Sequence, residues 1–150
     1  MSGVRLSRAY LPKMLDKNWG RIIFISSESA LNIPQEMIHY GMSKAAQIAV
    51  ARGLAEMTAN TAVTVNSILA GPTRSKGIKD FLQQMAEQKS VSVEEVEREF
   101  FAEDRPTSII KRFAEPQEVA NMVAYVASPL ASATNSAALR VEGGVLQSAF

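Results

Sequence analysis

The sequence contains no cysteine and a single histidine among its 150 residues. Without cysteine there can be no disulfide framework, no thiolate nucleophile and no zinc–sulfur site. One imidazole cannot supply the paired ligands that most transition-metal sites use, so we expect no metal site. Any redox chemistry therefore has to come from a bound organic cofactor.

The two signs of charge are nearly balanced, because the chain has 16 Lys and Arg and 15 Asp and Glu, for a formal net charge of +1. With this balance the chain has no excess of positive charge whose electrostatic field would attract a nucleic acid or an anionic membrane. No apolar run approaches the ~18 residues of a membrane span, and the N-terminus lacks the apolar stretch of a secretory signal. We expect a soluble cytoplasmic protein, although the basic, acid-poor residues 1–15 fit a transit peptide as well as a surface helix.

Apolar residues make up 47% of the chain, and their pattern predicts one α/β domain over residues 1–150. Residues 21–27 form an apolar run without alternation, which is typical of a strand buried on both faces of a parallel sheet. Residues 62–69 are strand-like as well, and residues 137–142 could form a last strand. Helical periodicity covers residues 4–15 with a late break at Pro12, and then residues 38–59, 77–89, 92–103 and 116–128. The alternation predicts a parallel sheet of three strands whose first strand keeps an unpaired edge.

Tyr40 and Lys44 stand four residues apart in the longest predicted helix, which places the phenol and the ammonium on one face. A lysine cation beside a tyrosine favours the phenolate, so the hydroxyl can act as a general acid or base near neutral pH. This spacing alone also fits an ordinary pair on a helix surface. Ser27 and residues 71–75 follow the first two strands, where parallel sheets present ligand-binding residues, so all of these positions are candidates for one site.

In this order and spacing the motifs resemble the short-chain dehydrogenase/reductase family. The resemblance rests on GRIIFISS at residues 20–27, Tyr40-x-x-x-Lys44, NSILAGPT at residues 66–73, EVA at residues 118–120 and VEGG at residues 141–144. It implies the C-terminal part of a doubly wound Rossmann-type parallel sheet with flanking helices. It also implies hydride transfer between NAD or NADP and a small-molecule carbonyl compound or secondary alcohol.

Residue roles follow from the same resemblance. Tyr40 would exchange a proton with the substrate oxygen, Lys44 would also bond the nicotinamide ribose, and Ser27 would donate to the substrate oxygen as charge develops there. Residues 77–104 correspond to a mobile lid that shapes substrate choice. The helix that carries Tyr40 corresponds to an interface of a homo-oligomer. Cofactor contacts are implied for Tyr40, Lys44, Gly71, Pro72, Thr73 and Ser75.

The family's glycine-rich turn seats the cofactor pyrophosphate at a helix N-terminus, and it belongs to an N-terminal half that this sequence lacks. None of the eight glycines forms G-x-G-x-x-G. We therefore expect little or no turnover from these residues alone. The alternative function is a non-catalytic truncated homologue that acts as an assembly or interaction protein through its interface helices and exposed strand edge.

Overall fold

A parallel sheet of three strands forms the centre of the computed structural model, which describes residues 2–149. β1 (Gly20–Ser27) pairs along its whole length with β2 (Val63–Ala70), and the shorter β3 (Ala138–Val141) pairs with the carboxyl half of β2. The order β1-β2-β3 and the common strand direction confirm the predicted sheet. Because the strands are parallel, their carboxyl ends meet at one edge.

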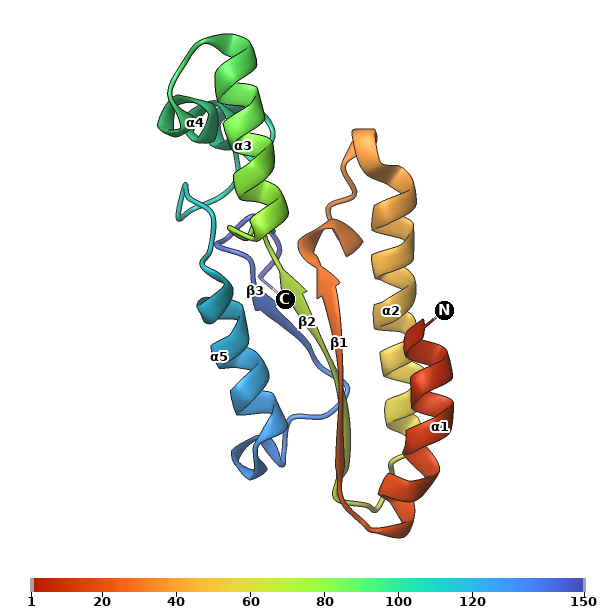
Figure 1. Ribbon diagram of the computed structural model, residues 1–150. Coiled ribbons are helices and arrows are strands. Elements are labelled where there is room, and N and C mark those ends of the chain that lie inside the picture. The colour runs from red at the N-terminus through yellow and green to blue at the C-terminus, as the bar shows by residue number, and fades with distance from the viewer. Residues whose placement is uncertain (1, 150) are drawn as a thin grey trace.

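Helices cover both faces of this sheet (Figure 1). α1 (Ser2–Asp16) and α2 (Ile38–Glu56) lie on one face, and α5 (Pro116–Ala127) lies on the other. β2 is buried at almost every position, as expected for a strand that is covered on both sides. Within residues 2–149, no helix combines the length and the apolar character needed to cross a membrane. The core beneath α2 consists of Phe24, Ala51, Ala55 and Val65.

Between β2 and α5 the chain makes a helical excursion beyond the carboxyl edge of the sheet (Figure 1). It consists of α3 (Lys76–Lys89) and α4 (Val93–Glu103), close to the limits predicted for both helices. The excursion closes where Thr73 and Ala114 form a parallel bridge. It has a core of its own, separate from the one beneath α2 and made of Leu82, Ala86, Val96, Phe101 and Phe113.

Two helix limits differ from the prediction. α1 continues through Pro12 to Asp16, although a break was expected at the proline. Proline removes one N–H of the helix and crowds the carbonyl four residues earlier, but Pro12 and Arg8 are both exposed, so water can satisfy that carbonyl. α2 ends at Glu56 rather than near residue 59, because the next residues form a turn in which Asn60 takes a left-handed φ of 62°.

Candidate active site

A cavity of about 600 Å³ opens at the edge of the sheet where β1 and β2 end. The ends of these two strands, the first turns of α2 and the helical excursion all contribute to its lining. The structure therefore brings together the residues that the sequence analysis selected from three separate segments. All of them line the cavity, namely Ser27, Tyr40, Lys44, Gly71, Pro72, Thr73 and Ser75.

Tyr40 and Lys44 lie in the first turns of α2. The Lys44 ammonium is 5.5 Å from the centre of the Tyr40 ring, and its Nζ donates a hydrogen bond to the carbonyl oxygen of Ile25 at 2.9 Å. Because partial burial penalises the charged form, the pKa of Lys44 lies below its ordinary value. An ammonium carries three donors, so the bond to the β1 backbone fixes its position while N–H groups remain for a ligand.

Ser27 ends β1 and caps the short 3₁₀ helix Glu28–Ala30. Its Oγ accepts a hydrogen bond from the Ser29 N–H at 3.1 Å and donates one to Oε2 of Glu28 at 2.5 Å. A hydroxyl has a single hydrogen, so in this arrangement Ser27 can offer the cavity a lone pair and not a donor. Beside it, Ser26 donates to the carbonyl oxygen of Lys44 at 2.9 Å, and this bond ties α2 to β1.

The loop of residues 71–75 follows β2 and is held close to the sheet. The Gly71 N–H donates to the Val141 carbonyl at 3.0 Å, and a Cβ at Gly71 would lie 2.6 Å from Cα of Glu142, so only glycine fits this approach. Thr73 donates its hydroxyl hydrogen to the Gly71 carbonyl at 2.9 Å. Ser75 caps α3 by accepting a hydrogen bond from a backbone N–H. The loop therefore presents a fixed backbone to the cavity.

Glu28 and Arg105 are among the residues of the cavity lining that were not selected from the sequence. Their side chains are 5% and 10% exposed, and Nε of Arg105 donates to Oε1 of Glu28 at 3.3 Å. They stand 77 positions apart, so no local pattern could pair them. Each looks like an ordinary surface charge in the sequence, and the only available signal was that Glu28 directly follows Ser27. His39, which precedes Tyr40, is exposed.

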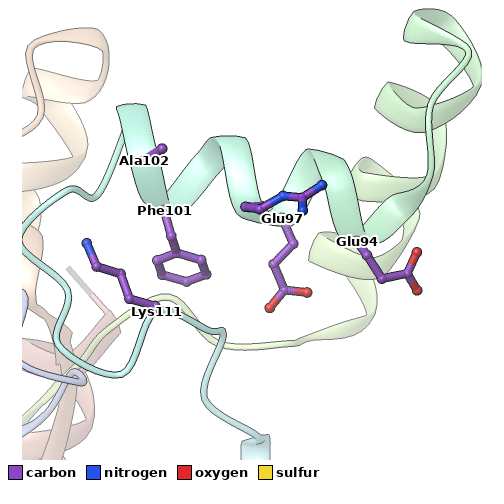
Figure 2. A pocket seen from close by; sticks show the side chains of 6 residues that line it. Glu94, Glu97, Phe101, Ala102 and Lys111 are labelled. Carbon is purple, nitrogen blue, oxygen red and sulfur yellow. The ribbon is translucent and has the colours of Figure 1, made fainter.

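A second hollow, of about 480 Å³, lies beside α4 and outside this cavity. Figure 2 shows Phe101 and Glu97 projecting from α4 toward the segment that bears Lys111, with Glu94 further along the helix. Both carboxylate oxygens of Glu97 already accept hydrogen bonds from Nη2 of Arg74 at 2.8 Å. Of the two acids that line this hollow, Glu97 is thus engaged in fastening the excursion to the loop after β2.

Comparisons with known proteins agree with this architecture. Residues 1–146 match the family described as Enoyl-(Acyl carrier protein) reductase. The chain is 46% identical to the uncharacterized oxidoreductase YvaG of Bacillus subtilis (strain 168) over 150 residues, which are 100% of this chain and 57% of YvaG. It is 31% identical to the 3-oxoacyl-(acyl-carrier-protein) reductase FabG of Aquifex aeolicus (strain VF5) over 135 residues, which are 90% of this chain and 48% of that protein.

Among solved structures, L-sorbose reductase from Gluconobacter frateurii in complex with NADPH and L-sorbose matches with a TM-score of 0.90 at 26% identity, over 99% of this chain and 55% of that chain. The F189W actinorhodin polyketide ketoreductase with NADPH matches with a TM-score of 0.76 at 30% identity, over 90% of this chain and 50% of that chain. The chain thus spans about half the length of the relatives it matches. Because the family match covers nearly the whole chain and the parallel strands with their flanking helices form a Rossmann-type fold, the chain belongs to the short-chain dehydrogenase/reductase family of oxidoreductases.

Proposed function

We propose that the chain supplies the substrate end of a nicotinamide-dependent oxidoreductase that acts on a small carbonyl compound or secondary alcohol. The observation that carries the proposal is the convergence of Tyr40, Lys44 and Ser27 on one cavity beside residues 71–75. A phenol and an ammonium in one cavity can move a proton and stabilise a charge, which are the tasks that carbonyl reduction requires of a protein. The similar reductases solved with NADPH support this cofactor class.

The residues present fit the nicotinamide end of such a cofactor. Lys44 retains N–H groups beyond its bond to Ile25, and these would hold the ribose hydroxyls. Gly71, Pro72, Thr73 and Ser75 would border the nicotinamide with the fixed backbone of their loop. When bound, the nicotinamide supplies or accepts the hydride. The sequence contains no G-x-G-x-x-G turn for the pyrophosphate, and its residues favour neither NAD nor NADP.

Tyr40 would exchange the proton with the substrate oxygen. The Lys44 cation, 5.5 Å from the Tyr40 ring, would stabilise the phenolate that remains after the proton has been given to the substrate. Ser27 would donate to the substrate oxygen, and to do so it has to turn its hydrogen away from Glu28. Proton transfer therefore depends on Tyr40 and Lys44, while the stabilisation of charge on the substrate oxygen depends on Ser27.

The helical excursion would act as a lid over the substrate. Ile78 and Phe81 of α3 and Phe100 of α4 line the cavity opposite the strand ends. Phe81 is 47% exposed, although it is a large apolar side chain. An apolar lid excludes water from the reacting groups and selects substrates by shape, so these side chains would contact the part of the substrate that does not react.

The proposal is tested by titrating the purified chain with NADH and NADPH while cofactor fluorescence and thermal unfolding are followed together. Saturable binding should raise the unfolding temperature, because a ligand of the folded state stabilises it. Lys44→Met should weaken binding by at least ~10-fold, since hydrogen bonds to a charged group are lost, whereas Lys13→Met on exposed α1 should leave binding unchanged. Tyr40→Phe should retain binding and remove any turnover. No binding at millimolar cofactor would overturn the proposal and favour an interaction role.

We also infer that the chain forms a homo-oligomer through α2. Ile38 and Met42 are each 64% exposed, and the exposed Ala46, Ala49 and Gly53 continue the same face of the helix. Small and apolar side chains at this spacing allow a second helix to approach closely. Sedimentation at micromolar concentration should show an oligomer, and Met42→Glu should shift it toward the monomer. A monomeric wild-type chain would contradict this inference.

A further inference from the structure

Glu28 is a buried acid that the proposed mechanism does not use. It directly follows Ser27, and its residue is 4% exposed. One carboxylate oxygen, Oε2, accepts the only hydrogen of the Ser27 hydroxyl at 2.5 Å. The other, Oε1, accepts a hydrogen bond from Nε of Arg105 at 3.3 Å. A single carboxylate therefore connects a residue of the active site to a residue at the end of the excursion.

Arg105 comes two residues after the end of α4 and is itself 9% exposed. Its Nη1 donates to the carbonyl oxygen of Asp104 at 2.7 Å and lies 3.8 Å from Oε1 of Glu36. The guanidinium also lies 5.7 Å from the centre of the Phe100 ring on α4. These contacts hold Arg105 against the excursion on one side and against Glu28 on the other.

Stability alone is a weak reason for such a pair. Two charges that leave water lose hydration, and replacing a buried ion pair with well-packed apolar residues is often neutral or stabilising. The position of the pair is more informative, because the strength of Glu28 as an acceptor decides how firmly it holds the Ser27 hydrogen. An unpaired buried carboxylate is a strong acceptor, whereas a carboxylate that shares its charge with a guanidinium is a weaker one.

We propose that Glu28 is a positioning residue for Ser27, and that Arg105 makes this positioning depend on the docked excursion. When α4 is docked, Arg105 shares the charge of Glu28 and allows the Ser27 hydrogen to turn toward a substrate oxygen. When α4 moves away, Glu28 keeps that hydrogen. The link among the three residues rests on the contacts above, and its value for reduction rests on the proposed function.

Nuclear magnetic resonance and hydrogen exchange test the link without any turnover. The Ser29 N–H donates to Ser27 Oγ, so the Ser29 amide resonance reports the orientation of the Ser27 hydroxyl. Arg105→Gln should shift this resonance and should speed amide exchange in α4 by at least ~10-fold, because a buried pair is broken. The control is Arg98→Gln, which removes only an exposed ion pair with Glu95 on α4 and should do neither.

A second variant guards against loss of folding. The double variant of Glu28→Gln and Arg105→Met carries neither charge of the buried pair, so it should fold and still show the shifted Ser29 resonance. If the chain turns over substrate, Arg105→Gln should lower kcat and Glu28→Gln should partly restore it in the same molecule, because an amide oxygen is a weaker acceptor. An unchanged Ser29 resonance in Arg105→Gln would refute the link. Absence of cofactor binding with a shifted resonance would instead refute only the proposed function.

Discussion

Replacing Phe113 with alanine tests whether the excursion is a separate cooperative unit. Phe113 is 1% exposed and belongs to the core of the excursion. Its ring stacks on Phe100 and meets Phe101 edge-on, with 5.0 Å between centroids in both pairs. The core beneath α2 shares no residue with this cluster. The substitution should therefore destabilise α3 and α4 more than the sheet.

Removing a fully buried phenylalanine ring costs about 3–5 kcal/mol, because apolar contacts are lost and a cavity remains. If that cost falls on opening of the excursion, amide exchange in α3 and α4 should speed up by ~100-fold or more. If the whole chain unfolds in one step, the unfolding temperature should fall by about 6–20 °C, since 1 kcal/mol corresponds to roughly 2–4 °C at this size.

Hydrogen exchange measured by mass spectrometry separates these outcomes. In Phe113→Ala, peptides from α3 and α4 should exchange faster while those from β2 keep the wild-type rate. Phe81→Ala is the matched control, because that ring is 47% exposed on α3 and its loss should cost little. Equal acceleration in β2 and α4 would show that the two cores unfold together, and the reasoning from separate clusters would be wrong.

Two further predictions concern acid stability and glycine. Hydrogen bonds from the Arg112 guanidinium and then from the Glu115 N–H hold the pKa of Glu118 at about 2, so its stabilising contribution is present above the ordinary value and is lost as pH falls toward 2. Glu118→Gln should therefore reduce the loss of stability in acid, as measured by urea unfolding at a series of pH values; an unchanged pH dependence would contradict this. Gly71→Ala should cost about 1–3 kcal/mol, because its Cβ would meet the backbone of the residue that follows β3. Gly77→Ala should instead stabilise the chain by about 0.4–1 kcal/mol, since its Cβ would meet nothing within 4 Å in α3; thermal melts that show equal losses in both glycine variants would refute the contrast.

The fold was predictable because most of its helices and strands have a local sequence pattern that indicates them. β2 is rich in β-branched and apolar residues and is buried at almost every position, as is typical of a strand covered on both faces. Ser92 begins α4 as predicted, with its hydroxyl accepting the Glu95 N–H at 3.1 Å. The Glu95 side chain pairs with Arg98 and does not complete a capping box with Ser92. The helix limits at Pro12 and beyond Glu56 depended on exposure and on a left-handed turn, which periodicity does not encode.

The candidate site was predictable as far as its residues have a fixed spacing or follow a strand. Tyr40 and Lys44 share a helix face, and Ser27 ends a strand, so each could be selected before its neighbours were known. Glu28 and Arg105 could not, because packing of the excursion brings them together across 77 positions. The link from the Ser27 hydroxyl through Glu28 to the excursion runs through that contact, so it was beyond sequence reasoning as well.

The bridge between Thr73 and Ala114 makes this point of the fold a site at which one inserted segment can be replaced by another. Arg74 donates its N–H to the Ala114 carbonyl at 2.8 Å, and Ala114 donates to Pro72 at 2.9 Å, so the backbone is paired where the excursion leaves and returns. The entropy of closing a loop grows only with the logarithm of its length, at about 0.6 kcal/mol for each doubling. Segments of very different length could therefore be grafted between these two residues while the sheet keeps its register, so that the lining of the cavity and the fold can diverge independently.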